Sequence, residues 1–485
     1  ELFSREPPAL KYFQIFTQSP RRTAGQVRQT AAAASPTSRI LIGLMMPAGL
    51  IILNEVIFNV ALPTIRDDFA ISADVSAWVV TAYLLPYVML MPLYGRLGDG
   101  LGKRRLLLLG LIVFLIGTTI GLVAPSLSLL MLGRVIQGVG AAGVNPLCMA
   151  LISERFPALE RGQALGTWNS VGPAVAQVGP LIGGVMVDQL SWQSIFGPIF
   201  LLGLSAAAMV KRLVPPAERS FIQPGFLRSL DWGGVTLLGA AIMMLIFFVS
   251  SRPITGVDAL QDWRLLALAL LFLAGFIIWE KRHSNPFVRL AIFANRSFDQ
   301  ASLGSGIRMF ILSSLSFLIP LYLADVHALS ATAIGLLLLF QAGALFVTMR
   351  RGGQLADRWG SRRPVIIGSL AQFGVMIYFA LLPGSAWPGW VAMGLIGHGL
   401  GAGLSLAALH RAALEGVDPA QTGMAAGLYS MIRFGGSAIG TALAGVILQF
   451  GLDRSDVVID AFQLVFWFMA GVALLGVATA WGLRD

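Results

Sequence analysis

Long apolar runs separated by short polar segments dominate the chain. Each run is about twenty residues long, the length of a helix that crosses a hydrocarbon core about 30 Å thick. The runs are continuously apolar, whereas a membrane-barrel strand needs only about ten residues of alternating polarity, so helices are predicted. The fourteen predicted spans are 40–63, 74–94, 106–123, 127–150, 163–187, 193–211, 232–250, 263–280, 298–324, 331–349, 364–383, 387–409, 421–449 and 459–482.

The composition excludes a soluble globular protein. Of the 485 residues, 56% are hydrophobic and only 12% are charged, whereas about a quarter of the residues in a soluble chain are charged. The sequence therefore predicts an all-α, multi-pass integral membrane protein. Its one cysteine, Cys148, lies within an apolar run, which excludes a disulfide framework and a cysteine-rich metal site.

The basic residues indicate how the spans are oriented. A net charge of +10 would suggest nucleic acid binding in a soluble chain, but here nearly all Lys and Arg residues lie in alternate linkers. If the N-terminus is cytosolic, the positive-inside rule is obeyed and both termini are cytosolic. Residues 1–39 lack the pattern of a signal peptide and are expected to form a cytosolic tail. The exceptions to the rule are Arg66, Arg252, Arg264 and Arg454 on the outer side and Arg134, Arg308 and Arg433 inside spans.

One polar segment occurs twice. The segment 95–105, with sequence GRLGDGLGKRR, returns at 353–363 as GQLADRWGSRR. Shifting the first span by the distance between Asp99 and Asp357 carries it onto 298–321, which coincides with the ninth span. The chain is therefore predicted to contain two related halves.

The repeat predicts the domain organisation. We expect a six-helix bundle at 40–211, two inserted helices at 232–280 and a second, pseudo-symmetric six-helix bundle at 298–482. Parallel repeats of this kind place a binding site between the halves near the membrane midplane, and one half rocks against the other. This is the architecture of a transporter.

Several motifs resemble those of a known family. Span four contains RVIQGVGAA at 134–142, span one ends in NVALP at 59–63, and span five contains GP at 172–173 followed by GPLIGG at 179–184. With the doubled loop motif, these resemble the major facilitator superfamily, and within it the fourteen-span drug:proton antiporter branch. The resemblance implies an exporter of the bacterial cytoplasmic membrane, driven by a proton gradient without a cofactor.

The resemblance assigns the repeated loop to gating of the cytosolic side. An aspartate is favoured at a helix N-terminus and can pair with an arginine on a neighbouring helix in one conformation only. The alternative is a basic turn that merely obeys the charge rule. The candidate gating residues are Gly95, Asp99, Gly102, Arg104, Arg105, Gly353, Asp357, Gly360, Arg362 and Arg363.

Span five is a candidate hinge. Proline removes a helical hydrogen bond, and small residues about four apart allow two helices to approach closely. The family resemblance implies a kink at the interface between the halves, and simple helix packing is the alternative. The residues concerned are Gly172, Pro173, Gly179, Pro180, Gly183 and Gly184.

Glu55 is the candidate proton carrier, because it is the one acid deep within a predicted span. It lies about two turns before Pro63, and Arg134 lies about as far into span four, so the two can share a depth. A static buried ion pair is the alternative. The family usually carries its acid at the position of Asn54, about 100° away around the helix. Either Glu55 takes over the proton role from another direction, or coupling is altered or lost.

Other polar and aromatic side chains inside spans are candidates for a substrate cavity, although core packing is the alternative for each. One acid against three arginines favours a neutral, zwitterionic or anionic amphiphile over a purely cationic one. The candidates are Gln137, Trp168, Arg308, His398, Tyr429 and Arg433.

The sequence therefore predicts a monomeric secondary exporter of amphipathic or lipophilic compounds, coupled to protons by antiport and surrounded by membrane lipid. The alternative is a lipid or hydrophobic-metabolite transporter with weak or no proton coupling. The chain contains no GxxxxGK[ST] motif for ATP, no GxSxG, no HExxH and no metal-ligand spacing. An enzyme and a nucleic acid partner are not expected.

Overall fold

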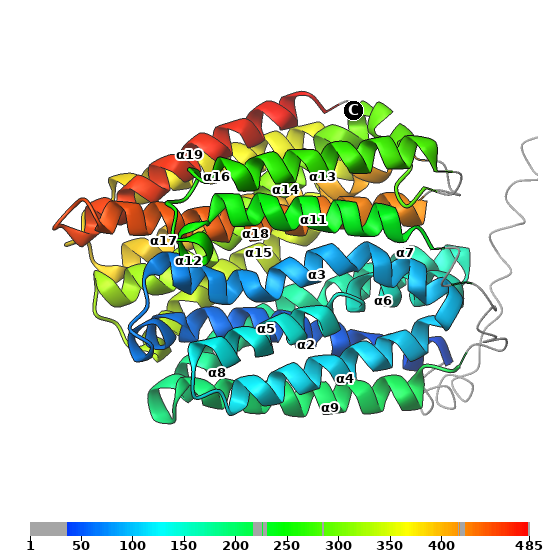
Figure 1. Ribbon diagram of the computed structural model, residues 1–485, viewed down its shortest axis with the longest axis horizontal. Helices are drawn as coiled ribbons and strands as arrows, with labels where there is room; N and C mark the ends of the chain where they lie inside the picture. Colours follow the sequence, from blue (N-terminus) through cyan, green and yellow to red (C-terminus); the bar gives the residue numbers. More distant parts are fainter. Residues whose placement is uncertain are drawn as a thin grey trace, which may run out of the picture.

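The computed structural model describes residues 36–216, 226, 230–283, 286–415, 417 and 422–483. Within these residues the secondary structure is helical and contains no strand. Fourteen helices are long and apolar enough to cross a membrane, so the predicted fold class and number of spans are confirmed. They run side by side along one direction (Figure 1). The predicted tail 1–39 lies outside the described residues except for its last four, which begin the first helix.

The helices fall into three sets along the chain. The first six spans are α2 (Pro36–Asp68), α3 (Ala73–Leu101), α4 (Lys103–Leu122), α5 with α6 (Leu127–Ala141 and Val144–Arg155), α7 with α8 (Ala158–Asn169 and Val171–Gln189), and α9 (Phe196–Leu213) after the short η2 (Trp192–Ile195). The next two are α11 (Trp232–Val249) and α13 (Trp263–Arg282), joined through α12 (Arg252–Thr255). After η3 (Leu290–Ala294) follow α14 (Arg296–Asp325), α15 (Ala331–Trp359), α16 (Arg362–Leu381), α17 (Pro388–Leu414), α18 (Thr422–Leu452) and α19 (Val458–Trp481).

The two ends of the helix bundle differ. The repeated segments 95–105 and 353–363 both lie at the end on the right of Figure 1, which we call the motif end. The other end, which carries the loop after α2 and the loop after α14, is called the opposite end. Helices α3 and α15 extend through the polar motif to Leu101 and Trp359, well beyond the predicted span ends.

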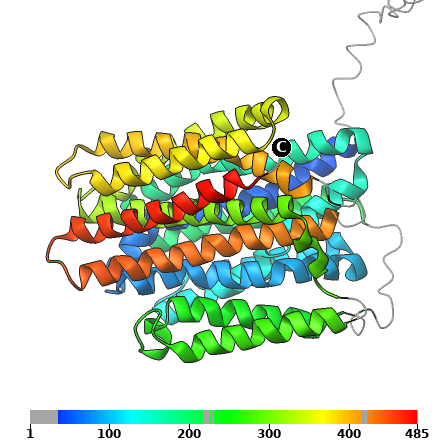
Figure 2. The same cartoon turned by 90° about the horizontal axis from the view of Figure 1, so that it is seen from above.

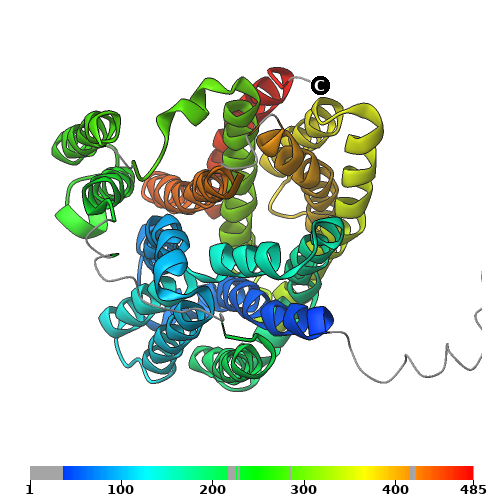
Figure 3. The same cartoon turned by 90° about the vertical axis from the view of Figure 1, so that its right-hand side faces the viewer.

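The helices gather into two groups with a pair beside them, as the view from the motif end shows (Figure 3). Helices α2 to α9 contact one another, as do α14 to α19. The groups meet where α8 packs on α15, α3 on α18 and α2 on α14.

Helices α11 and α13 lie on one flank of the molecule (Figure 2). Helix α11 contacts α3 and α18, at one of the places where the two groups meet. Helix α13 packs mainly on α11, and only 17% of its most apolar stretch is buried, against 78% for α14. The inserted pair is thus a peripheral layer over one side.

Glycines in span four explain how the first group packs so closely. A Cβ at Gly138 would lie 2.2 Å from the carbonyl oxygen of Tyr83, and one at Gly140 would lie 2.3 Å from the backbone nitrogen of Phe114. Helix α5 therefore touches the backbones of α3 and α4 directly. This approach holds Arg134 and Gln137, on the same helix, inside the first group, where they are 2% and 0% exposed.

Candidate functional site

Glu55 and Arg134 lie near the middle of α2 and α5 but are not in direct contact. Among the described residues, no ion pair joins them. The Arg134 Nε donates to the carbonyl oxygen of Val79 at 3.3 Å, and its Nη1 donates to Gln137 Oε1 at 3.1 Å. The guanidinium also lies over the rings of Phe58 and Tyr83, 4.0 and 4.6 Å from their centroids. Neutral groups and aromatic faces therefore take the place of the carboxylate at Arg134.

Glu55 lies where the two groups of helices face each other. Its side chain is half-buried, and its charge interacts with those of Arg134 in the first group and Arg433 in the second. A carboxylate in this position is attracted by a cation of each group.

Asn54 has a different environment from its neighbour Glu55. It is fully buried, and its Oδ1 accepts a hydrogen bond from Gln137 Nε2 at 3.3 Å. Gln137 also donates to Thr118 Oγ1 at 2.9 Å. The Asn54 Nδ2 has no partner among the described residues. The position at which the family usually carries its acid is thus held by a buried amide, which Gln137 connects to Arg134.

Arg308 and Arg433 lie in the second group with neutral partners. Arg308 is 4% exposed, and its Nε donates to the carbonyl oxygen of Ala402 at 2.9 Å. The Arg433 Nη1 lies 3.2 Å from His410 Nε2, and the His410 ring packs on Tyr429 at a centroid distance of 5.0 Å. The charges of the two arginines interact with each other. Three candidate cavity residues, Arg308, Tyr429 and Arg433, are therefore brought together.

His398 and Trp168 are each packed inside one group. His398 is fully buried, and its ring nitrogens lie 3.0 Å from Gln341 Nε2 and 3.3 Å from Gln372 Nε2. The Trp168 Nε1 donates to the carbonyl oxygen of Leu44 at 3.0 Å. Leu44 lies about 16 Å along α2 from Glu55, toward the motif end. These contacts are those of packed core residues.

Aromatic rings bridge the two groups near Glu55. The rings of Tyr83 and Tyr87 are stacked at 5.8 Å, and Phe434 meets Tyr87 edge-on at 5.1 Å. The sequence analysis did not single out Tyr87 or His410. His410 follows the predicted end of its span at 409, but α17 continues to Leu414 and carries it inside.

The two candidate gating aspartates pair within their own groups. Asp99 Oδ1 lies 2.8 Å from Lys103 Nζ, and Lys103 also contacts Glu154. Asp357 Oδ1 lies 2.9 Å from Arg411 Nη1. The expectation that these acids sit at helix N-termini is wrong, because α3 and α15 continue through the motif and place both in a last helical turn.

The other motif residues shape the turn that follows. Gly102 and Gly360 have φ values of 90° and 79°, which favour glycine, and each separates two successive helices. Arg104 Nη2 donates to the carbonyl oxygen of Lys211 at 2.7 Å. Gly95, Arg105, Gly353, Arg362 and Arg363 also lie at the motif end.

Span five is broken at Ser170, between α7 and α8. Gly172 and Pro173 therefore lie in the first turn of α8, where a proline costs no hydrogen bond. Farther along α8, Gly179 and Gly183 face α2, because a Cβ at these positions would lie 2.3 Å from Val56 and 3.1 Å from Ile57.

Helix α8 also contacts the second group. A Cβ at Gly184 would lie 2.3 Å from the carbonyl oxygen of Ala331, and one at Gly335 would lie 2.3 Å from that of Pro180. The candidate hinge residues thus pack on both sides, within their own group and across the interface to α15.

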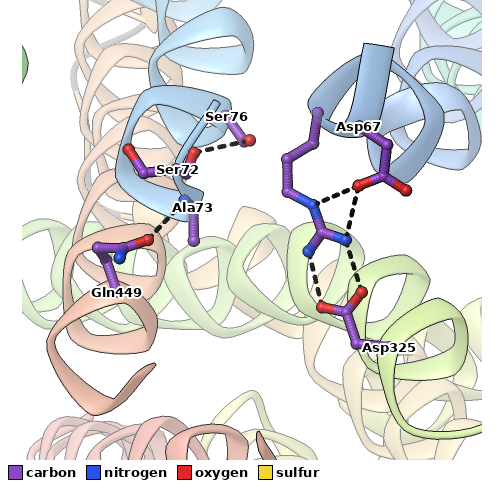
Figure 4. A network of polar contacts seen from close by, with 7 residues as sticks. Asp67, Ser72, Ala73, Ser76, Asp325 and Gln449 are labelled. Atoms are coloured by element: carbon purple, nitrogen blue, oxygen red, sulfur yellow. Dashed lines mark hydrogen bonds and ion pairs between the residues drawn. The ribbon is translucent and has the colours of Figure 1, made fainter. Parts of the chain in front are cut away.

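Hydrogen bonds between the two groups occur at the opposite end in the described chain. Arg66 makes a bidentate pair with Asp325, with distances of 2.7 and 2.6 Å, and also binds Asp67 (Figure 4). Nearby, the backbone nitrogen of Ala73 donates to Gln449 Oε1 at 2.8 Å.

Asp188 adds a further link at this end. Its carboxylate accepts hydrogen bonds from the backbone nitrogens of Ala331 and Thr332, at 3.0 and 2.8 Å, and so caps the start of α15. The sequence analysis missed this link and the Arg66–Asp325 pair. The repeat offered one signal, since it maps Asp67 onto Asp325.

The inserted pair is also tied to the second group at the opposite end. Arg252 Nη1 lies 2.8 Å from Asp453 Oδ2. Hydrogen bonds from Gln449 and Arg252 hold the pKa of Asp453 below its usual value, so this carboxylate stays ionised at neutral pH. Among the described residues, no three His, Cys, Asp or Glu side chains lie close enough to hold a metal ion.

Comparisons with known proteins identify the family. The model of the Major Facilitator Superfamily matches residues 44–441 and 301–485. The chain is 32% identical to the multidrug resistance protein Stp of Mycobacterium tuberculosis, over 85% of this chain and 75% of that protein. It is 28% identical to the tetracenomycin C resistance and export protein of Streptomyces glaucescens, over 84% of this chain and 74% of that protein.

A solved structure supports the fold. The D-xylose-proton symporter superposes with a TM-score of 0.65 at 13% identity, covering 92% of this chain and 98% of that one. Both the sequence motifs and the helix arrangement thus agree with the family match. The chain belongs to the major facilitator superfamily, a family of membrane transporters.

Proposed function

We propose that this transporter exports amphipathic or lipophilic compounds from the cytosol in exchange for protons. The observation that carries the proposal is the position of Glu55, a half-buried carboxylate in mid-span, without an ion-pair partner among the described residues, facing both groups of helices. An unpaired intramembrane acid is costly and is seldom kept without a function. The names of the relatives, which include a multidrug resistance protein and an export protein, support drug-like substrates.

We further propose that the motif end faces the cytosol of a bacterial inner membrane and that the monomer works by alternating access. The basic linkers lie at the motif end, as the positive-inside rule requires. The cross-group bonds of Arg66, Ala73 and Asp188 lie at the opposite end. In this arrangement the outer end is closed and substrate enters from the cytosol. The segments 95–105 and 353–363 would then lock the cytosolic end in the alternate state.

Substrate-evoked proton release from the purified protein tests the coupling. In weakly buffered detergent solution, adding a neutral amphiphile is expected to release protons from the wild type. The variant Glu55→Gln, which keeps the shape of the side chain and removes the titrating group, is expected to lose that release while still binding the amphiphile.

The matched control is Glu154→Gln, an acid of the same group that lies at the motif end beside Lys103. Release should persist in this control. Unchanged release in Glu55→Gln would show that another group carries the proton. Binding without any release from the wild type would favour the second candidate function.

That second candidate is a lipid or hydrophobic-metabolite transporter with weak or no proton coupling. The amide at Asn54 favours it, because this side chain is fully buried and bonded to Gln137. A carboxylate that normally titrates at this position in the family would be absent here. The same proton-release measurement separates the two candidates.

A further inference from the structure

A cluster of hydrogen-bond donors in the second group is only partly satisfied. Arg308 lies on α14 and Arg433 and Tyr429 lie on α18, with His410 of α17 between the last two. Ser305 lies on the same face of α14 as Arg308, three residues earlier, with its hydroxyl near that of Tyr429. We call these five residues the arginine cluster.

The positive charge of the cluster is not matched by acids of the second group. Among the described residues, no carboxylate makes an ion pair with Arg308 or Arg433. Arg308 is 4% exposed and binds only the carbonyl oxygen of Ala402 and the sulfur of Met309, at 2.9 and 3.7 Å. A buried guanidinium without a counter-charge is unfavourable, and an anion beside it would lower this cost.

Unsatisfied hydrogen-bond donors accompany the two guanidinium groups. The hydroxyls of Tyr429 and Ser305, with residue exposures of 3% and 0%, have no hydrogen-bond partner other than each other among the described residues, and the Nε of Arg433 has none. Buried donors are normally satisfied, and each one left unmet costs free energy. A group that offers several acceptor oxygens would satisfy them together.

Buried aromatic rings lie next to the cluster. Phe434 follows Arg433 in the chain, and its ring meets Tyr87, which stacks on Tyr83 of the first group. A ligand that places an oxygen-rich head at Arg433 can therefore place an apolar or aromatic body on these rings.

We propose that the arginine cluster binds the anionic head group, a carboxylate or phosphate, of an amphipathic substrate. Guanidinium groups bind such oxyanions through two parallel hydrogen bonds, and the adjacent hydroxyls supply further donors. The inference rests on the proposed export function and names its substrate class, but it holds whether or not protons are exchanged.

Glu55 sets a condition on this binding. It is an acid of the first group whose charge interacts with Arg433. An ionised Glu55 and a bound anion would draw on the same guanidinium, so each weakens the attraction of the other. The anion is expected to bind most tightly when Glu55 carries a proton or is replaced by Gln.

Three probes with one aromatic body test the head-group preference: pyrenebutyrate, pyrenebutanol and pyrenebutylamine. Binding to the full chain in lipid nanodiscs is followed by energy transfer from tryptophan to pyrene, and the signal of empty nanodiscs is subtracted. We expect pyrenebutyrate to bind about tenfold more tightly than pyrenebutanol, and pyrenebutylamine to bind most weakly.

Variants assign the preference to the cluster. Arg308→Gln and Arg433→Gln are each expected to weaken pyrenebutyrate binding about tenfold and to change pyrenebutanol binding less than about twofold. Tyr429→Phe removes only a hydroxyl and should weaken pyrenebutyrate binding several-fold, and Arg433→Lys should restore part of the affinity lost in Arg433→Gln. The matched control is Arg454→Gln, an arginine of the same group that lies over Phe450 at the opposite end.

The proposal would be overturned if pyrenebutyrate bound no more tightly than pyrenebutanol, or if its advantage survived in the double variant of Arg308 and Arg433. Glu55→Gln separates this result from that of the proposed function. The variant should keep or strengthen pyrenebutyrate binding, whereas its proton release tests antiport alone.

Discussion

At the scale of single residues, two neighbouring side chains on α2 near the centre of the molecule have different environments. Asn54 is fully buried and bonded to Gln137, whereas Glu55 is half-buried and its charge interacts with that of Arg433 in the second group. A step of one residue turns the side chain by about 100°, which is enough to move a polar group from the helix core to the interface. The protein thus keeps an acid at the same depth but in another direction.

Replacing Asn54 by aspartate tests what this change in direction does. In Asn54→Asp a carboxylate would accept a hydrogen bond from Gln137 with no cation in contact, so the folded state should lose about 1–3 kcal/mol at neutral pH. We expect a lower unfolding temperature in detergent and additional proton release on addition of a neutral amphiphile. Proton release equal to that of the wild type would show that this position does not communicate with the substrate.

Gln137 connects Asn54, Thr118 and Arg134, so its removal should affect stability strongly. In Gln137→Leu these three side chains each lose a buried partner, and the expected loss of stability is at least about 2 kcal/mol. Thermal unfolding in detergent measures the change. Gln163→Leu, on an exposed face of α7, is the control and should unfold at the wild-type temperature.

At the scale of helices, the bonds at the opposite end tie the two groups together. The Arg66–Asp325 pair is bidentate and joins the last turns of α2 and α14, which are equivalent positions in the two halves. An ion pair of this geometry opposes separation of the two helices. It therefore favours the conformation observed here over one that opens at this end.

Breaking that pair should shift the conformational equilibrium. In Arg66→Gln we expect the open state at the opposite end to become about tenfold more populated, which corresponds to about 1.4 kcal/mol. Spin labels on Thr64→Cys and Val457→Cys report the distance between the groups, and the native Cys148 is buried and stays unlabelled.

Arg264→Gln is the matched control, because this arginine lies at the same end but pairs with Asp262 within the inserted pair. The distance distribution of Arg264→Gln should match that of the labelled protein in which both arginines are unchanged. A distribution in Arg66→Gln that is indistinguishable from this control would mean that the pair does not hold the end closed.

The crossing of α8 and α15 offers a second test at this scale. Gly335→Ala would push a methyl group into the carbonyl of Pro180, which lies 2.3 Å from the new Cβ. Overpacking of this kind should cost about 1–3 kcal/mol of stability. Gly343→Ala, on the same helix but with nothing within 4 Å of its Cβ, is expected to be neutral or slightly stabilising, and thermal unfolding compares the two.

At the scale of the whole molecule, the number of spans and the all-α fold could be predicted from sequence because both follow from local hydropathy. The ends of α3 and α15 could not, since the polar motif continues as helix to Leu101 and Trp359. The breaks near Gly143 and at Ser170 were also missed, because packing between helices determines them.

Contacts between helices were the least predictable part of the candidate site. Depth along a helix placed Glu55 and Arg134 at one level, but the rotation of each helix decides whether side chains meet, and Arg134 bonds to Gln137 and Val79 instead. The Arg66–Asp325 pair joins positions far apart in the chain, so local patterns carry little information about it.

The charge of the centre predicts how an anionic substrate is driven. A monoanion moves its charge through the membrane, so its export should draw on the membrane potential whether or not a proton is exchanged. For a monoanion, 100 mV supplies about 2.3 kcal/mol, an equilibrium ratio of about fifty. In proteoliposomes, a potassium diffusion potential should drive pyrenebutyrate toward the positive side by more than it does in protein-free vesicles, which report passive diffusion of the protonated acid.

Pyrenebutanol is the matched control in the same vesicles, because a neutral molecule carries no charge through the potential. Accumulation of pyrenebutyrate that follows the pH gradient and ignores the potential would contradict this account of its energy source.

The inserted pair gives the molecule two unlike flanks. A lipid that approaches the junction of α8 and α15 meets those helices themselves, with Val178 and Val347 exposed. A lipid on the other side meets α13 first, then α11, before it reaches α3 and α18. A hydrophobic compound dissolved in the bilayer therefore meets one layer of helices on one side and an additional layer, α11 with α13, on the other. We expect such compounds to pass between the lipid and the centre of this transporter mainly on the side of α8 and α15.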